Sequence, residues 1–178
     1  MSFPYTVYLS PEQVLQETAA QRLPIGARGV SEDGMSFRYA QGGATALKAH
    51  VLCISPIEGP GSSATDQVFY SAYAAGTTYV KLALSTVTDL YAKDYLRDGY
   101  LVVNSTDITY NQKVRIHSNE ALVSSTALNQ QTGIWLVRPG LTKPVDTSTA
   151  LGKIVPSPYR KVLVSTDANG PGIPLGVT

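Results

Sequence analysis

The sequence predicts an all-β protein, an antiparallel β-sandwich or barrel of short strands with one short N-terminal helix and extended terminal arms. Three observations lead to this prediction. About ten short apolar segments are bounded by Gly or Pro at intervals of roughly 8 to 12 residues. Only one segment begins with the capping residues of a substantial helix. Neither a strand–helix alternation nor an internal repeat runs along the chain, which argues against a βαβ architecture.

Residues 1–24 are predicted to form an N-terminal arm and a short helix. Aromatic and small side chains alternate over the first nine residues, which is typical of a strand that pairs either with its own sheet or with a neighbouring subunit. Ser10 is a suitable N-cap, Pro11 fits the first helical position and Gln13 completes a capping box. A narrow apolar stripe then predicts roughly three turns of helix, ending near residue 21.

Residues 25–56 are predicted to form a β-hairpin and a return strand. The hairpin turns at Ser31–Gly34, because Asp-Gly tolerates positive φ and the Ser and Asp side chains can bond their own backbone. Apolar and polar side chains alternate over residues 35–40, as in a strand with one buried face. The return strand lies in the apolar run 47–54. This run contains the single cysteine, Cys53, which excludes an intramolecular disulfide and is expected to be buried.

Residues 57–178 are predicted to form the main β-domain with an extended C-terminal tail. Strands are expected near residues 66–74, 77–84, 100–104, 114–117, 121–128, 134–137, 153–155 and 161–164. Gln130–Gly133 is expected to be a turn, and Gly99 is expected to close a short helical turn. The tail, Asn169–Thr178, contains two prolines and three glycines, so we expect it to run extended over a surface, its own or a partner's.

Composition favours contact with other proteins. Charged residues make up only 15% of the 178-residue chain, whereas 33 Ser and Thr and 11 Tyr supply much of the polar surface. The formal net charge is +1 and the basic residues are scattered singly, so nucleic-acid binding is not expected. No apolar run approaches the roughly 18 residues of a membrane span. The N-terminal residues lack the pattern of a signal peptide, which predicts a soluble protein made in a cytoplasm.

Candidate catalytic and metal-binding side chains are few. They are two histidines, three carboxylates near turns and three aspartates of one segment: His50 and His117; Glu32, Asp33 and Asp66; Asp89, Asp94 and Asp98. The histidines lack the spacing of a ligand pair, turn carboxylates commonly close their own turn, and the aspartates do not match a calcium-binding loop. The sequence therefore predicts no metal, no cofactor and no enzymatic activity.

A carbohydrate-binding or hydrolytic β-domain is the alternative from a different functional class. Four aromatic side chains could form a platform for a sugar: Tyr91, Tyr95, Tyr100 and Trp135. Aromatic residues at strand positions more often belong to a core, which makes this alternative the weaker one.

Several short motifs resemble a pattern in small virion proteins of tailed bacteriophages. In chain order they are Arg22–Gly26, Glu32–Gly34, Phe37–Ala40, Gly43–Leu47, Asp98–Val103, Val114–Ile116 and Pro174–Val177. The chain departs from the pattern at His50 and at residues 107–111. On these motifs the protein resembles the capsid decoration, or cement, proteins of tailed bacteriophages, which are encoded near the major capsid protein.

The resemblance implies a non-enzymatic virion structural protein that binds the outer capsid surface and stabilises contacts between major capsid protein subunits. It also implies synthesis in the host bacterial cytoplasm, a location in the virion and a homo-oligomer, with a trimer favoured over a dimer. A neck, tail or fibre-base protein is the alternative within the virion.

The residues expected at the capsid or subunit interface lie in the two terminal arms. They are Phe3, Tyr5, Val7 and Tyr8 in the N-terminal arm and Ile173, Pro174, Leu175 and Val177 in the C-terminal arm. An arm that becomes ordered on binding loses about 1–2 kcal/mol of conformational entropy per residue, so these side chains would have to bury apolar surface. The alternative for both arms is that they close the protein's own sheets.

Overall fold

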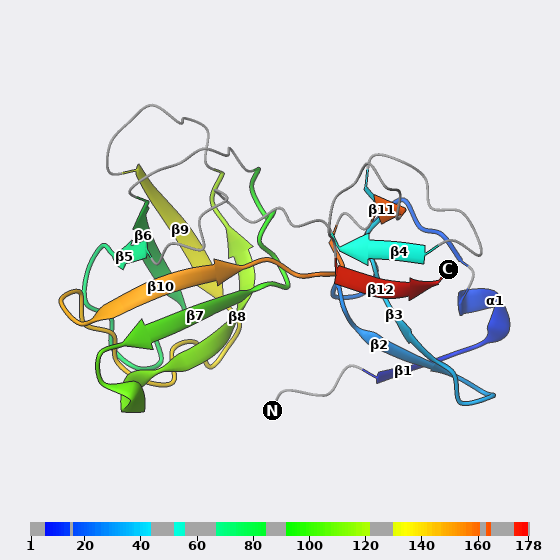
Figure 1. Cartoon of the computed structure of the whole chain (residues 1–178), viewed down its shortest axis with the longest axis horizontal. Helices are drawn as coiled ribbons and strands as arrows, with labels where there is room; N and C mark the ends of the chain where they lie inside the picture. The colour runs from blue at the N-terminus through cyan, green and yellow to red at the C-terminus, as the bar shows by residue number, and fades with distance from the viewer. Residues whose placement is uncertain are drawn as a thin grey trace. The chain divides into compact units, whose positions relative to one another are not determined.

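A computed structural model describes residues 6–14, 16–43, 52–55, 67–84, 92–121, 130–160, 163–164 and 173–177 (Figure 1). This part of the chain is all-β, with twelve strands, one α-helical turn and one 3-10 turn, so the predicted fold class is confirmed. The chain divides into two compact units, residues 58–157 and residues 1–57 with 158–178. Among the described residues, no helix has the length and apolar character needed to cross a bilayer.

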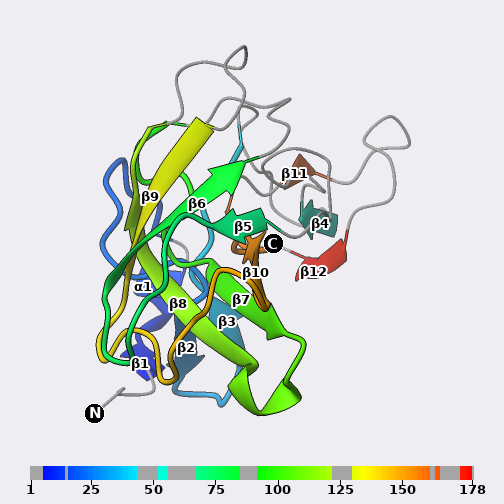
Figure 2. The same cartoon turned by 90° about the vertical axis from the view of Figure 1, so that its left-hand side faces the viewer.

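The first of these units, residues 58–157, is a closed antiparallel barrel. Its strands are β5 (Gln67–Phe69), β6 (Tyr79–Leu84), β7 (Tyr100–Ser105), β8 (Gln112–Asn119), β9 (Gln130–Leu136) and β10 (Ala150–Val155). They follow one another in the order β10-β5-β6-β9-β8-β7, and β7 pairs with β10 to close the ring (Figure 2). Closure pairs every strand on both sides, so the barrel has no open edge.

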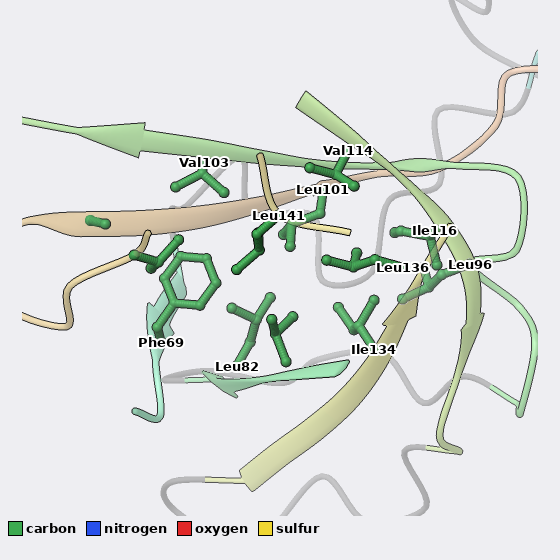
Figure 3. Close-up of a cluster of buried hydrophobic side chains, with 13 residues drawn as sticks. Phe69, Leu82, Leu96, Leu101, Val103, Val114, Ile116, Ile134, Leu136 and Leu141 are labelled. Carbon is green, nitrogen blue, oxygen red and sulfur yellow. The ribbon is translucent and has the colours of Figure 1, made fainter. Parts of the chain in front are cut away.

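Alternating side chains fill the interior of the barrel. Along β6, Val80 and Leu82 are fully buried, whereas Tyr79, Lys81 and Ala83 between them face outward. The same period of two places side chains from the other strands in one hydrophobic core (Figure 3). The core comprises Phe69, Val80, Leu82, Leu96, Leu101, Val103, Val114, Ile116, Ile134, Leu136, Leu141, Val145 and Ala150. The strand predicted near residues 77–84 is therefore confirmed.

The turn predicted at Gln130–Gly133 is wrong, because these residues lie inside β9. Gly133 is buried opposite Lys81 of β6. A Cβ atom at this position would come within 2.5 Å of the Tyr79 hydroxyl and 2.6 Å of the Glu120 carboxyl carbon. The absence of a side chain at Gly133 therefore lets Tyr79 and Glu120 lie close to the β9 backbone, and this glycine does not mark a turn.

Two connections of the barrel are ordered by short turns. Between β7 and β8 lies the 3-10 turn η1 (Ile108–Tyr110), which Asp107 begins by accepting a hydrogen bond from the Thr109 amide. Before β7, residues 93–98 form hydrogen-bonded turns in place of the predicted short helical turn, and Gly99 follows them. Leu96 of these turns is fully buried, so the segment contributes to the core.

The other unit contains the predicted hairpin. Its three-stranded sheet has the order β1 (Thr6–Leu9), β2 (Arg28–Ser31) and β3 (Ser36–Arg38). β2 and β3 are antiparallel, and β1 pairs with β2 in parallel. The turn between β2 and β3 is the predicted one, with Gly34 at a φ of +81°.

The helix is shorter than predicted. α1 spans Pro11–Val14, a single turn, whereas the apolar stripe predicted about three turns. The capping box is confirmed, since the Ser10 amide donates to Gln13 Oε1 at 3.0 Å and the Gln13 amide donates to Ser10 Oγ at 3.4 Å. Beyond this turn, the Thr18 hydroxyl bonds the Ala20 carbonyl and contacts the Tyr39 hydroxyl at 3.2 Å. These contacts hold the chain out of helical geometry, so tertiary structure overrides the local pattern.

The return strand and the C-terminal tail share a second three-stranded sheet. Its order is β11 (Leu163–Val164), β4 (Leu52–Ser55) and β12 (Ile173–Val177), with both outer strands antiparallel to β4. The tail thus pairs with its own chain, which is one of the two surfaces expected for it. Residues 158–178, which we expected in the main β-domain, group with the N-terminal segment.

Replacing Gly34 with valine should lower the free energy of unfolding by about 1–2 kcal/mol, because a β-branched residue is strained at positive φ. An added Cβ would meet no atom within 4 Å, so the cost is that of the backbone conformation alone. Thermal unfolding of this variant and of Glu32→Val, an exposed residue of the same turn, tests the prediction. Equal melting temperatures for the two variants would contradict it.

Candidate functional site

A groove opens at one end of the barrel, where β5 and β7 finish and β10 begins. The ladder register places these strand ends at one level, since Leu151 of β10 lies opposite both Val68 of β5 and Asn104 of β7. The chain after β5 and the chain before β10 complete the walls, and an antiparallel bridge between Tyr73 and Val145 joins them. We call this feature the barrel-end groove.

The barrel-end groove has an apolar base and a polar rim. Its volume is about 520 Å³, within the range of sites that take a small molecule or an anchoring side chain. Val103, Val145 and Ala150 form part of the base and are buried. The polar groups along the rim belong to Ser105, Tyr110, Asp146 and Thr149. A ligand would therefore bury an apolar portion and direct a polar group toward the rim.

Asp146 supplies the one carboxylate among the residues that line the groove. Its Oδ1 accepts hydrogen bonds from the Ser148 amide and hydroxyl, both at 2.8 Å. These two bonds lower the pKa of Asp146 below its ordinary value, with the backbone bond as the larger cause. The lowered pKa keeps the carboxylate ionised at neutral pH. Its Oδ2 accepts no hydrogen bond from the other described residues, so this oxygen can accept one from a ligand.

Basic side chains are missing from the described lining of the groove. Lys143, three residues before Asp146, directs its Nζ to the carbonyl oxygen of Thr109. Gln112 fixes the same segment, because its Oε1 accepts from the Thr142 and Lys143 amides and its Nε2 donates to the Lys143 carbonyl at 2.9 Å. The groove wall is thus held by hydrogen bonds, and its lining carries a negative charge.

Exposed apolar side chains flank the barrel-end groove. Ile108 and Tyr110 of η1 are 77% and 42% exposed, and Tyr110 also lines the groove. Val68 and Leu151 are cross-strand neighbours on the outer face of β5 and β10, and Tyr70 follows on the same face with 58% exposure. Five exposed apolar side chains of the barrel therefore belong to the strands and turns beside the groove, where a partner protein could cover them.

A second cluster lies on the outer face of β6 and β9. Tyr79 and Trp135 are cross-strand partners whose ring centroids lie 4.8 Å apart. The Tyr79 hydroxyl donates to Glu120 Oε1 at 2.9 Å, and the Gly133 amide donates to Glu120 Oε2 at 3.2 Å. Both oxygens of the Glu120 carboxylate therefore accept hydrogen bonds within the protein. The cluster joins the residue after β8 to β6 and β9.

The phenol of Tyr79 should lose its proton at a higher pH than an ordinary tyrosine does. Burial, followed by the hydrogen bond and negative charge of Glu120, raises its pKa to about 12. Because the pKa is raised on folding, the neutral phenol stabilises the fold fully below about pH 10, and this contribution is lost as the pH rises through about 12. Ultraviolet absorbance of tyrosinate should show a late component that disappears in Tyr79→Phe. Tyr70→Phe, which removes an exposed tyrosine of the same barrel, should retain it.

The aromatic residues of the predicted sugar platform lie in different environments. Tyr95 is half-buried and packs against the barrel core. Tyr100 lies on β7 with the Lys113 ammonium 3.9 Å from its ring centroid, and Trp135 lies on β9, which β8 separates from β7. Tyr91 lies outside the described residues. The described members therefore do not assemble into one flat surface.

The predicted acidic and histidine candidates are also dispersed. Asp94 pairs with Arg97 at 3.2 Å and Asp98 with Arg115 at 2.7 Å, so two of the three aspartates take part in ion pairs. His117 is exposed on β8. Glu32 and Asp33 lie in the hairpin turn, whereas His50, Asp66 and Asp89 lie outside the described residues. In the described ranges, no three His, Cys, Asp or Glu side chains converge as metal ligands would.

The predicted interface residues fall on two strands of the smaller sheets. Val7 and Tyr8 lie in β1, where Val7 is half-buried and Tyr8 is 84% exposed. Ile173, Pro174, Leu175 and Val177 lie in β12, with Leu175 at an irregularity in its pairing with β4. Phe3 and Tyr5 lie outside the described residues. Among the predicted interface residues whose side chains are described, Tyr8 is therefore the one that a partner could contact over most of its surface.

Sequence reasoning did not single out the barrel-end groove. Its lining comes from four stretches spread over residues 72–150, and Asp146 falls between the strands predicted near 134–137 and 153–155. An Asp-x-Ser pattern such as that at 146–148 is common where a side chain caps its own backbone, and it does not by itself indicate a ligand site. The strand register that brings these stretches together could not be derived from spacing.

Comparison of the chain with protein-family models, with curated proteins and with solved structures finds no match in any of the three.

Proposed function

We propose that this protein is a non-enzymatic decoration protein, which binds the outer surface of a tailed-bacteriophage capsid and stabilises contacts between major capsid protein subunits. The observation that carries the proposal is the set of exposed apolar side chains around the barrel-end groove. Buried apolar and aromatic groups provide most of the free energy of protein–protein association, and a rigid barrel presents them without a large loss of conformational entropy.

The low charge of the chain supports the same function. With charged residues at 15% and a formal net charge of +1, the surface resembles the charge-depleted centre of a protein interface. The sequence motifs that resemble a pattern in virion proteins point to the major capsid protein as the partner. Tyr8 of β1 offers a second contact, because β1 pairs only with β2 among the described strands and carries neither a charge nor a proline to block a further strand.

Addition of purified protein to capsids that lack it tests the proposal. We expect saturable binding in co-sedimentation, with a copy number in the hundreds per particle, and a higher melting temperature of the decorated shell. A stoichiometry of a few to a few dozen copies would favour a neck, tail or fibre-base protein. Failure of the folded protein to bind such capsids would overturn the proposal. Light scattering of the free protein separates a trimer from a dimer.

Two matched variants locate the contact surface. Tyr70→Ser beside the barrel-end groove should weaken capsid binding by roughly tenfold, in the range of an interface aromatic residue. Val137→Ser removes an apolar side chain that is 39% exposed elsewhere on the barrel, and should leave binding unchanged. Tyr8→Ser tests the N-terminal strand separately. Equal losses for Tyr70→Ser and Val137→Ser would show that the contact does not lie at the barrel-end groove.

A further inference from the structure

We infer that the barrel-end groove receives a basic side chain, an arginine or lysine flanked by apolar residues, from an extended segment of the partner protein. The inference rests on the proposed function for the identity of the partner, the capsid shell. The chemistry of the groove can be tested without that shell.

Charge selects the basic side chain. Among the described residues the groove lining holds one carboxylate and no lysine, arginine or histidine, so an anionic group would enter against the charge of Asp146. The open Oδ2 of Asp146 can accept a hydrogen bond from a guanidinium or ammonium group. The nearby Lys143 does not fill this role, because its Nζ is bonded to the Thr109 carbonyl.

The remaining walls suit the stem and the flanking residues of such a segment. Arginine and lysine carry long apolar stems, which the alanine, valine and proline side chains of the groove can cover. Tyr110 lines the groove and is 42% exposed, so its ring is available to a cation. The barrel already uses this contact elsewhere, where the Lys113 ammonium lies 3.9 Å from the centroid of the Tyr100 ring. Ile108 and Tyr70 outside the groove offer apolar surface to the flanking residues.

Three peptides of equal length test the charge selection on the intact chain. They are acetyl-Leu-Arg-Leu-amide, the same peptide with citrulline, which keeps the shape but removes the charge, and the same peptide with glutamate. In amide NMR titrations we expect saturable shifts at Ala72, Ser105 and Thr149 with the arginine peptide. Binding of the citrulline peptide should be about fivefold weaker, and the glutamate peptide should not saturate. Equal affinities for the three peptides, or shifts distributed away from the groove, would overturn the inference.

Asp146→Asn is the decisive variant, because an asparagine oxygen can still accept the Ser148 bonds while the charge is lost. It should abolish the preference for arginine over citrulline. Asp107→Asn is the matched control, since Asp107 accepts the amide and hydroxyl of Thr109 in the same way but does not line the groove. It should keep the preference. An unchanged preference in Asp146→Asn would contradict the inference.

Steric closure of the groove gives an independent check. Ala72→Trp places bulk at an exposed position of the wall, and Ala75→Trp places the same bulk at an exposed position outside it. Only the first should remove binding of the arginine peptide. If the wild-type protein binds capsids and Asp146→Asn and Ala72→Trp bind them equally well, the groove inference fails and the proposed function stands. If the wild-type protein binds the arginine peptide selectively but not capsids, the proposed function fails instead.

Discussion

Replacing Gly140 with alanine should lower the free energy of unfolding of the barrel by about 3–5 kcal/mol, as measured by guanidinium denaturation. Gly140 has a φ of +84°, where an L side chain is strained. Its Cβ would lie 2.3 Å from the Thr77 carbonyl oxygen and 2.8 Å from the carbonyl carbon, which belong to backbone and cannot rotate away. Thr77 and Leu141 are hydrogen-bonded, so the two segments would have to separate.

Gly76→Ala provides a matched control for this prediction. Gly76 has nearly the same φ, +86°, but an added Cβ would meet no atom within 4 Å. Its substitution should therefore cost only the backbone strain, about 1–2 kcal/mol. A cost for Gly140→Ala no larger than that for Gly76→Ala would show that the close approach to Thr77 is not tight in solution.

The effect at Gly140 should also reach the barrel-end groove. The segment that follows Gly140 forms the wall of the groove, and it is aligned by the bonds of Leu141 with Thr77 and of Val145 with Tyr73. Displacement of Thr77 would shift both pairs. Loss of arginine-peptide binding in Gly140→Ala would therefore follow from distortion of the wall, without any change in the residues that line it.

Replacing Asn119 with alanine should cost about 2–4 kcal/mol of unfolding free energy, because a buried polar network would lose its centre. Asn119 is fully buried at the end of β8. Its Oδ1 accepts from the Leu96 amide at 2.7 Å, and its Nδ2 donates to the carbonyl oxygens of Ala92 at 3.1 Å and Glu120 at 2.7 Å. Without it, the buried Leu96 amide would lose its acceptor, and the turns before β7 would lose two of the hydrogen bonds that join them to the barrel.

Asn111→Ala separates this network from an ordinary hydrogen bond. Asn111 is exposed, and its Oδ1 accepts a single bond from the Ser105 amide at 2.7 Å. Water can replace that acceptor, so a cost of about 0.5–1.5 kcal/mol is expected. If both asparagine variants unfold at the same guanidinium concentration, the amide of Asn119 is not the element that holds the turns in place.

Whether a feature of this protein could be predicted from its sequence depends on whether its contacts are local or distant along the chain. The fold class, the strand β6, the hairpin turn at Gly34 and the capping box at Ser10 could all be predicted from the sequence. Each of these depends on residues within a few positions of one another, where side-chain period, backbone φ and local hydrogen bonds act directly. Composition likewise predicted a surface with few charges.

The other features depend on tertiary structure. It ended α1 after one turn through contacts of Thr18 with Tyr39, and it placed Gly133 inside a strand because Tyr79 and Glu120 approach it closely. It paired the C-terminal tail with β4, and it assembled the barrel-end groove from stretches spread over residues 72–150. These features depend on which strands pair and in which register. Strand pairing and register depend on the free energy of the whole packed chain, so they could not be predicted from the spacing of residues along the sequence.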